Sequence, residues 1–273
     1  MIGFDIDPGQ AARAGVPTAG SIGELVSQVD VVLLSLPDSS VVETVVYGED
    51  GVLRASRAGQ VVVDLSTAAP RSTVRIHGDL AAKEVAFVDA GISGGAAAAE
   101  QGTLTIMAGG SAEALEAVRP ILETAASRIY HMGEPGAGHV TKLLNNFLNG
   151  VSLAATAEVM VAARRAGLDL ARFLDVVNHS SGVNFATLNR FPRIIQGDYL
   201  EGGLTSRLMA KDLRLYLELL PELRVTSFTG AACLGVFNLA TALGYGDQIS
   251  NRVVDAIGDV AGGVRLYEKE DSA

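Results

Sequence analysis

The sequence predicts an α/β protein whose first part is a mostly parallel sheet with helices on both faces and whose second part is all-α. Two observations predict this fold class. Between residues 1 and 134, short apolar runs alternate with amphipathic segments, which is the pattern of successive strand–helix units. After Gly138 the strand signals stop and helical periodicity takes over. We therefore expect two domains, 1–134 and 135–273.

The strand predictions rest on apolar runs of strand length. The runs within 30–37 and 61–67 are almost continuously apolar at their start, as expected for strands buried on both faces of a sheet. Strands are expected at 2–6, 30–37, 61–67, 86–90 and 104–107. Helices are expected to begin near Ser21, at Pro70 and at Ser111, the last running to about Ser127.

The second part begins with one long predicted helix. Residues 140–165 contain no proline and only one interior glycine, Gly150. Further helices are expected at 169–178, 204–220 and 229–242. The long helix is more apolar around residues 147–154 than one exposed face requires, so we expect it to pack against a second subunit in a homodimer or homotetramer. A core formed within a single chain is the alternative.

Composition and charge exclude several classes of function. The 21 Lys and Arg against 31 Asp and Glu give a formal net charge of −10, which argues against nucleic acid or an anionic membrane as partner. One cysteine and four histidines without ligand spacing argue against a disulfide framework and against a metal site. No apolar stretch approaches the roughly 20 residues of a membrane-spanning helix, and the N-terminus lacks a signal-peptide pattern, so we expect a cytoplasmic protein.

Ligands of parallel sheets bind beyond the carboxyl ends of the strands, which makes the residues there candidates for cofactor binding. Asp5 ends the first predicted strand, where an acid can accept both ribose hydroxyls of an adenosine and would repel a 2′-phosphate. This favours NAD over NADP. The alternative for Asp5 is an ordinary turn acid. Leu36 and Pro37 end the next predicted strand and Thr67 ends the one after it, with simple turn chemistry as the alternative.

A glycine-rich turn follows the predicted strand at 86–90. In Ser93-Gly94-Gly95, one hydroxyl and two glycines can present a donor and backbone N–H groups to a carboxylate. A turn that binds no ligand is the alternative. The sequence therefore offers a candidate binding site for a small carboxylate substrate.

Two charged positions within apolar helical stretches are candidates for chemistry. Lys142 and Asn146 are four residues apart and share one face of the long helix. Burial lowers the pKa of a lysine, which suits it to proton transfer near neutral pH. Lys211 and Asp212 form a second charged pair. A solvated surface position is the alternative in both cases, and the four histidines, without a placed acid partner, are treated as structural.

These segments together resemble the β-hydroxyacid dehydrogenase family, which includes 3-hydroxyisobutyrate dehydrogenase and tartronate semialdehyde reductase. The family is similar to 6-phosphogluconate dehydrogenase. Residues 136–146 match the family's GxGxxxKxxNN helix at every fixed position, and residues 64–67 resemble its DxST turn. Residues 209–213 resemble its MxKDL segment. Residues 89–95 resemble its substrate loop, usually written DAPVSGG, with Gly91 and Ile92 in place of Pro-Val. Four ordered motifs cover nearly the whole chain.

The resemblance implies a Rossmann-like first domain and an oxidoreductase that transfers a hydride between a nicotinamide cofactor and a small β-hydroxyacid or its semialdehyde. It implies that Lys142 is the general acid or base and that Asn146 supports the substrate hydroxyl. Ser93, Gly94 and Gly95 would hold the substrate carboxylate. Leu36, Pro37 and Thr67 would contact the cofactor, Lys211 would lie near the nicotinamide, and Asp212 would fix Lys211. Phe185, Asn189 and Arg190 are further candidates for the pocket border, although nothing in the sequence places them there.

The chain departs from the family pattern at its start. The family opens with a strand and a GxGxxG turn that receives the pyrophosphate, and Gly3, Gly9 and Gly15 do not make that turn. Roughly 25 residues of a strand–loop–helix unit are not found. That strand lies in the middle of the doubly wound order. We therefore expect the two strands on either side of it to lack a pairing partner. We hypothesise that the true start lies before Met1; a shortened protein with a degraded cofactor site is the rival.

The residues leave two other functions open. A non-catalytic binding or scaffold protein of the same fold is supported by the missing phosphate turn. An imine reductase-like relative would share the fold, but members of that branch often replace the catalytic lysine, so Lys142 counts against it.

Overall fold

The computed structural model describes residues 1–13 and 15–267 and divides into two compact units, Met1–Lys142 and Leu143–Ala273. The division falls inside the long helix α8 (Ala137–Arg165), eight residues beyond the boundary expected at 134/135. Each unit has a hydrophobic core of its own.

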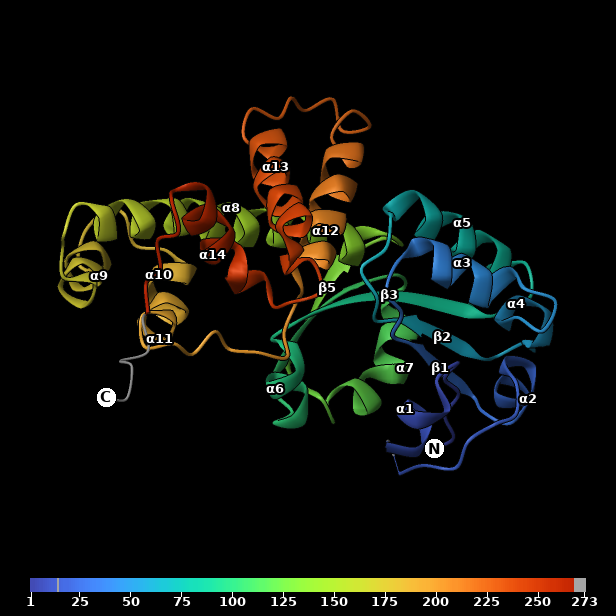
Figure 1. The fold of residues 1–273 in the computed structure, drawn as a ribbon. Coiled ribbons are helices and arrows are strands. Elements are labelled where there is room, and N and C mark those ends of the chain that lie inside the picture. The colour runs from blue at the N-terminus through green and yellow to red at the C-terminus, as the bar shows by residue number, and fades with distance from the viewer. Residues whose placement is uncertain (14, 268–273) are drawn as a thin grey trace. The chain divides into compact units, whose positions relative to one another are not determined.

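The first unit contains a five-stranded mixed sheet in the order β1-β2-β3-β4-β5 (Figure 1). Its strands are β1 (Val31–Leu34), β2 (Val61–Asp64), β3 (Ala86–Ser93), β4 (Leu104–Gly109) and β5 (Ala126–Gly133). All neighbouring pairs run parallel except β3 and β4, which are antiparallel. The link between these two strands holds only a six-residue helix, which is too short for the crossover that parallel pairing requires. The predicted α/β class is confirmed, with this one antiparallel step.

Helices cover both faces of the sheet. They are α1 (Pro8–Arg13), α2 (Ile22–Ser27), α3 (Ser39–Tyr47), α4 (Val52–Ala55), α5 (Pro70–Ala81), α6 (Gly95–Glu100) and α7 (Ala112–Leu122). Consecutive residues of β2 enter different cores: Val62 packs with residues of α2 to α5, and Val63 packs with residues of α7. Since side chains alternate along a strand, burial on both faces explains the continuous apolar run in the sequence.

Two strand expectations are wrong. No strand forms at 2–6, where Gly3 makes only an isolated parallel bridge with Thr18. The strand β5 was not expected, because the helix that begins at Ala112 was thought to run to about Ser127 and instead ends at Leu122. Most side chains of β5 are exposed or only partly buried, so its sequence lacks the apolar run that identified the other strands.

β1 forms one edge of the sheet. It pairs only with β2. Leu33 of β1 is 44% exposed, although its neighbours Val32 and Leu34 are buried. One face of β1 is therefore packed and the other is open to solvent in this structure.

In the described part of the second unit, residues 143–267, helices are the regular elements, and two residues, Thr205 and Ile249, form an isolated bridge. Besides the rest of α8, it holds α9 (Leu170–Asn178), α10 (Phe185–Asn189), α11 (Phe191–Ile194), α12 (Ser206–Leu219), α13 (Gly230–Ala240), η1 (Thr241–Tyr245), η2 (Ser250–Arg252) and α14 (Val253–Val260). The predicted helical second part is thus confirmed, and α10, α11 and α14 are additions to the expected helices.

Close packing against α12 explains the glycine in the middle of α8. A Cβ atom on Gly150 would lie 3.2 Å from Met209 Sδ and 3.3 Å from Leu213 Cδ2, both on α12. One turn earlier, the Phe147 ring stacks on Tyr216 with centroids 4.0 Å apart. The middle of α8 thus packs closely on α12 at two successive turns, through Gly150 at one and through the Phe147–Tyr216 pair at the other.

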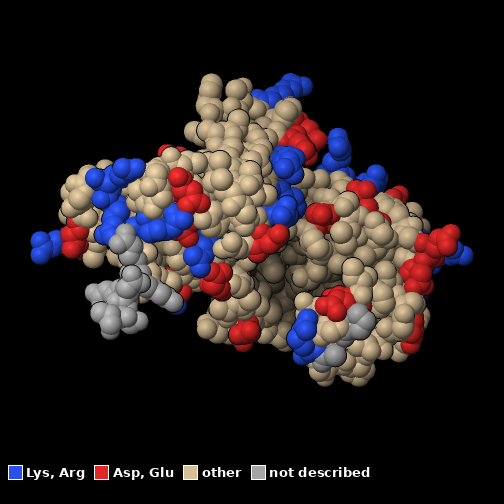
Figure 2. All heavy atoms as spheres, viewed as in Figure 1, with Lys and Arg blue, Asp and Glu red and all other residues tan. Residues whose placement is uncertain are grey.

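Both signs of charge lie on the surface. On the face of the molecule in Figure 2, basic and acidic side chains are scattered among uncharged residues, which cover most of that face. Among the described residues, no helix is long and apolar enough to cross a membrane. Within the same residues, no group of three or more His, Cys, Asp or Glu side chains is placed to hold a metal ion.

Candidate active site

A buried carboxylate fixes the start of α8. Asp89, on β3, is fully buried, and its Oδ1 accepts a hydrogen bond from Gly136 N while Oδ2 accepts one from His139 N, both at 2.8 Å. The first backbone N–H groups of a helix have no partner within the helix, and a negative charge there is favourable. Asp89 therefore anchors the first turn of α8 to the sheet.

Glycines let β3 approach α8 closely enough to place Lys142. A Cβ on Gly91 would lie 2.6 Å from Lys142 Cβ, and a Cβ on Gly138 would lie 2.5 Å from the Asp89 carbonyl oxygen. The Lys142 side chain therefore leaves the helix directly beside Gly91, and it is only 9% exposed. The alternative of a solvated surface lysine is wrong.

The glycine-rich turn continues from the same strand. Ser93 is the last residue of β3, two residues after Gly91, which is about 7 Å along a strand. Gly94 and Gly95 follow with φ angles of 134° and 73°, a region that residues with a side chain avoid. The first unit thus brings Lys142 and the Ser93 turn to the same end of β3.

The turns after β1 and β2 are joined by hydrogen bonds. Leu36 N donates to Ser66 Oγ at 2.9 Å, and Ser66 N donates to Asp64 Oδ1 at 2.9 Å. Pro37 and Thr67 follow directly on these two turns, so the predicted cofactor residues of both strands lie at adjacent carboxyl ends. Asp5 lies apart from any strand, is exposed, and accepts a hydrogen bond from Asp7 N at 2.8 Å, as a turn acid does.

His139 has an acid neighbour that the sequence did not reveal. Its Nδ1 lies 2.7 Å from Thr73 Oγ1, and its Nε2 lies 3.3 Å from the Asp64 carbonyl oxygen and 4.0 Å from Asp64 Oδ2. The expectation of no placed acid partner is wrong for His139, which is fully buried. It is also wrong for the exposed His179, whose Nδ1 lies 3.3 Å from Asp175 Oδ1. His139 ties the first turn of α8 to the turn after β2 and to α5.

In the second unit, one carboxylate holds two predicted site residues. Asn146 Nδ2 donates to Asp212 Oδ2 at 2.5 Å, and Lys211 Nζ lies 3.0 Å from Asp212 Oδ1. Because a carboxylate only accepts hydrogen bonds, it fixes the amide of Asn146 with the nitrogen toward Asp212 and the oxygen turned away. Asn145 Nδ2 donates weakly to that oxygen at 3.3 Å, which leaves it able to accept another hydrogen bond.

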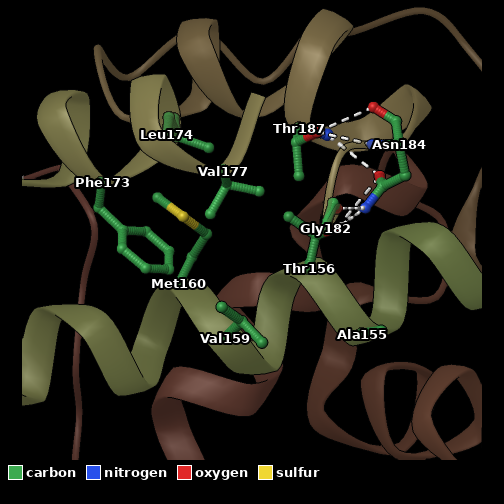
Figure 3. Close-up of a pocket in the computed structure, with 10 residues that line it drawn as sticks. All are labelled: Ala155, Thr156, Val159, Met160, Phe173, Leu174, Val177, Gly182, Asn184 and Thr187. Carbon is green, nitrogen blue, oxygen red and sulfur yellow. Dashed lines mark hydrogen bonds between the residues drawn. The ribbon is translucent and has the colours of Figure 1, made fainter. Parts of the chain in front are cut away.

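The helical unit also contains a pocket of about 230 Å³ outside these residues (Figure 3). Its walls are Ala155, Thr156, Val159, Met160, Phe173, Leu174, Val177, Gly182, Asn184 and Thr187. The lining is mostly apolar, and its polar members bond to one another: Asn184 and Thr187 form a capping box, and Asn184 bonds to Thr156. The pocket offers no charged group to a carboxylate.

The residues present fit part of a nicotinamide cofactor. The joined turns after β1 and β2 offer a binding edge at the carboxyl ends of two parallel strands, where such sheets bind ligands. Glycine turns lead from β3 into α6 at Gly94–Gly95 and from β4 into α7 at Gly110. Among residues 1–13 and 15–267, no turn from a strand into a helix has the GxGxxG spacing of a pyrophosphate turn.

Comparison with known proteins shows that the chain is an oxidoreductase of the nicotinamide-dependent class. Residues 7–133 match the NAD binding domain of 6-phosphogluconate dehydrogenase, and residues 136–257 match the NAD-binding domain of NADP-dependent 3-hydroxyisobutyrate dehydrogenase. The chain belongs to the NAD(P)-dependent β-hydroxyacid dehydrogenase family, the family of 3-hydroxyisobutyrate dehydrogenase.

Three relatives show how close the match is. The chain is 37% identical to 2-(hydroxymethyl)glutarate dehydrogenase of Eubacterium barkeri, covering 82% of this chain and 75% of the relative. It is 37% identical to the NAD-dependent L-serine dehydrogenase of Pseudomonas aeruginosa, covering 86% and 81%. The structure of 3-hydroxyisobutyrate dehydrogenase from Salmonella typhimurium superposes with a TM-score of 0.80 at 32% identity, covering 93% and 90%.

Proposed function

We propose that the protein transfers a hydride between NAD and a small β-hydroxyacid or its semialdehyde, with Lys142 as the general acid and base. The observation that carries this proposal is the position of Lys142: it is 9% exposed and lies against Gly91, on the strand that leads into Ser93-Gly94-Gly95. A lysine withdrawn from water beside a carboxylate-binding turn is suited to proton transfer on a bound hydroxyacid.

Each site residue has a separate role in this reaction. Ser93 Oγ and the backbone N–H groups of Gly94 and Gly95 bind the substrate carboxylate. The amide oxygen of Asn146, turned away from Asp212, accepts the hydrogen bond of the substrate hydroxyl. Lys142 Nζ takes the hydroxyl proton during oxidation and returns a proton to the carbonyl oxygen during reduction.

The bound nicotinamide supplies the hydride chemistry at the carbinol carbon. Leu36, Pro37 and Thr67 contact the cofactor at the joined turns, and Lys211, held by Asp212, lies on its nicotinamide side. The preference for NAD over NADP stays a prediction that rests on Asp5, an acid that would repel a 2′-phosphate but that ends no strand in this structure and accepts a hydrogen bond from Asp7 N. Arg13, the basic residue nearest to Asp5 in sequence, has Asp7 as a partner at 3.7 Å, which supports the same preference.

The decisive experiment replaces Lys142. Lys142→Ala lowers kcat by about 10²–10⁴, the range for loss of a general acid, when oxidation of β-hydroxyacids is followed through NADH absorbance. Lys83→Ala is the matched control, because Lys83 is exposed and donates only to the carbonyl oxygens of Leu53 and Arg54. Unchanged turnover in Lys142→Ala would refute the proposed role.

A non-catalytic binding protein of the same fold is the alternative that the residues left open. NADH fluorescence separates the two: saturable binding supports the dehydrogenase, and absence of binding together with absence of turnover supports the binding protein. A homodimer or homotetramer also remains a prediction, and light scattering of the purified protein tests it.

A further inference from the structure

The ring of His139 connects three elements of the first unit. His139 belongs to the first turn of α8 and is fully buried. Its Nδ1 lies 2.7 Å from Thr73 Oγ1 of α5. Its Nε2 lies 3.3 Å from the carbonyl oxygen of Asp64, the last residue of β2. One buried histidine at the start of α8 therefore bridges α5 and the carboxyl end of β2.

The atoms around Nε2 determine where the ring of His139 carries a proton. Nε2 faces two oxygens of Asp64, the carbonyl oxygen at 3.3 Å and Oδ2 at 4.0 Å. A carbonyl oxygen and an ionised carboxylate only accept hydrogen bonds, so an unprotonated Nε2 would turn its lone pair toward both of them. The hydroxyl of Thr73 can donate to Nδ1 or accept from it. The surroundings therefore require a proton on Nε2.

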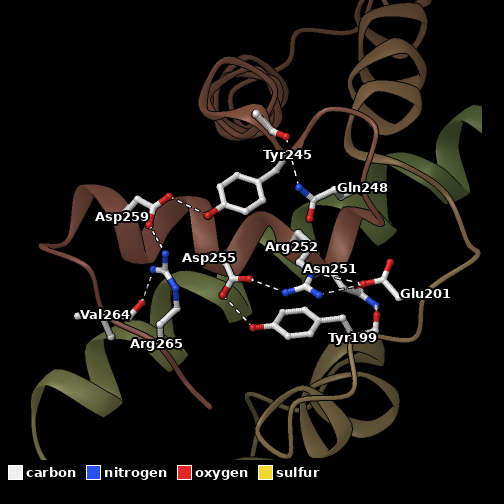
Figure 4. A network of polar contacts seen from close by, with 11 residues as sticks. Tyr199, Glu201, Tyr245, Gln248, Asn251, Arg252, Asp255, Asp259, Val264 and Arg265 are labelled. Atoms are coloured by element: carbon white, nitrogen blue, oxygen red, sulfur yellow. Dashed lines mark hydrogen bonds and ion pairs between the residues drawn. The ribbon is translucent and has the colours of Figure 1, made fainter. Parts of the chain in front are cut away.

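Asp64 has a carboxylate oxygen without a donor. Its Oδ2 is buried and accepts no hydrogen bond within the part of the chain that the structure describes. The buried Asp255 of the second unit differs, because its Oδ1 accepts from Tyr199 Oη at 2.8 Å and its Oδ2 from Arg252 Nη1 at 3.1 Å (Figure 4). A buried acceptor without a donor is unfavourable. The Nε2–H group of His139 is placed to compensate Oδ2 electrostatically.

Asp64 also organises the turns that the proposed cofactor site uses. Ser66 N donates to Asp64 Oδ1 and Leu36 N donates to Ser66 Oγ, both at 2.9 Å. Thr67 follows Ser66 directly. A shift of Asp64 would therefore move the turns after β1 and β2 together, and with them the residues proposed to contact the cofactor.

The same histidine lies close to Lys142 along α8. The two residues are three positions apart, which is about 4.5 Å along the helix axis and places them on neighbouring turns. The backbone N–H of His139 donates to Asp89 Oδ2 at 2.8 Å. The helix turn that leads to Lys142 is thus fixed to β3 through the backbone of His139, and to β2 and α5 through its ring.

We propose that His139 is a positioning residue of the reaction, whose Nε2–H group holds the cofactor turn after β2 in register with the helix turn that carries Lys142. This inference rests on the proposed function, in which that turn contacts the nicotinamide cofactor and Lys142 transfers the proton. His139 acts through Asp64 and not by contact with the substrate. Loss of the Nε2 contact therefore lowers the affinity for the cofactor and kcat together. KM for the hydroxyacid stays unchanged, because the Ser93 turn follows β3.

Two substitutions of His139 each keep one of its two contacts. The amide nitrogen of glutamine can take the place of Nε2, and that of the shorter asparagine can take the place of Nδ1. His139→Asn, which loses the contact to Asp64, weakens NADH binding by about three- to tenfold in a fluorescence titration and lowers kcat by about tenfold. His139→Gln, which keeps that contact and loses the one to Thr73, leaves both within about twofold.

A purely structural role of His139 predicts a different result. Each substitution removes one buried contact of the same ring, so a structural role would give similar losses in both. His131→Asn is the matched control, because His131 of β5 also places its Nε2 near a turn carbonyl, 2.7 Å from the Gly110 oxygen, but on a turn outside the proposed cofactor site. It leaves NADH affinity and kcat within about twofold. Equal effects of His139→Asn and His139→Gln on NADH affinity overturn the proposal.

Nitrogen NMR of the wild-type protein tests the same contact without a substitution and without turnover. In protein with isotope-labelled histidine, Nε2 of His139 carries a proton at neutral pH, and its signal is identified by its absence in His139→Gln. An unprotonated Nε2 overturns the proposal. If Lys142→Ala keeps full turnover while the NADH and NMR results hold, the proposed function is wrong and the role of His139 at the cofactor turn stands. If Lys142→Ala loses turnover but the two His139 variants behave alike, the inference about His139 alone is wrong.

Discussion

Two buried aspartates, one in each unit, hold the same helix by different means. Asp89 of the first unit accepts two backbone N–H groups from the start of α8. Asp212 of the second unit accepts the side-chain amide of Asn146 and pairs with Lys211. Both carboxylates are almost completely buried, at 0% and 1% exposure.

Because their partners differ, Asp89 holds the backbone of α8 in place, whereas Asp212 orients side chains. The partners of Asp89 are main-chain groups, which cannot move unless the helix moves, so Asp89 fixes the frame from which Lys142 projects. The partners of Asp212 are side chains, and Lys211 is 18% exposed, so this carboxylate orients Asn146 without holding the fold together. Loss of Asp89 should therefore affect stability most, and loss of Asp212 should affect turnover most.

The largest expected effect on stability comes from Asp89→Asn. An amide can accept one of the two N–H bonds but presents its own N–H₂ to the other, leaving a buried donor without an acceptor. We expect the free energy of unfolding to fall by about 2–4 kcal/mol, from the lost cap and charge-assisted bonds. Urea denaturation followed by circular dichroism measures this change.

The control for Asp89 is an aspartate that also has a partner but lies at the surface. Asp30 is 88% exposed and pairs with Arg57 at 2.7 Å. Asp30→Asn should change the free energy of unfolding by no more than about 1 kcal/mol, since exposed pairs contribute little. Equal effects of the two substitutions would contradict the role of Asp89 as an anchor.

A smaller effect on stability but a clear one on turnover is expected for Asp212→Asn. The substituted amide can still accept from Asn146 but can also rotate, so Asn146 loses its single orientation and Lys211 loses its opposite charge. We expect kcat to fall by about tenfold or more, since misplacement of a substrate-orienting group by about 1 Å costs up to 10²-fold.

The matching control for Asp212 is Asp247, which is 83% exposed and pairs with Arg207 at 2.8 Å. Asp247→Asn should leave kcat and KM unchanged. If Asp212→Asn raised KM alone and left kcat intact, Asp212 would act on substrate binding rather than on the orientation of Asn146 for the reaction.

The smallest expected effect is a lack of reaction at Cys233. This residue of α13 is 6% exposed, and burial raises the pKa of its thiol to about 12. A thiol reagent at pH 8 should therefore label the native protein at least about 100-fold more slowly than the unfolded protein. Rapid labelling of the native form would show that the packing of α8 on α12 and α13 opens, and would weaken the contrast between the two units.

The sequence predicted most of the fold because periodicity is a local property. The apolar run of β2 predicted a strand buried on both faces, and the uninterrupted pattern of 140–165 predicted the long helix that forms as α8. It missed β5, because an edge strand with exposed side chains carries no apolar run. It also placed a strand at 2–6, where a strand-like sequence has no neighbour with which to form a ladder.

The residue types of the candidate site were readable, but their partners were not. Lys142, Asn146 and the Ser93 turn stand out by motif and spacing in the sequence. Asp89 meets its N–H donors 47 and 50 residues away, Asn146 meets Asp212 66 residues away, and Arg190 meets Asn251 61 residues away. Such pairings follow from the packing of whole elements, which no local pattern encodes.

The amino-acid sequence by itself therefore determined the class of fold, the order of the two parts and the identity of the lysine, amide and glycine turn, because each depends on residues close together in the chain. Only the tertiary structure decided that Lys142 is withdrawn from water, that Asp212 orients Asn146 and that His139 contacts the end of β2. The burial of a side chain and the presence of an opposite charge beside it depend on residues from distant segments of the chain. Those residues become neighbours only when the chain folds.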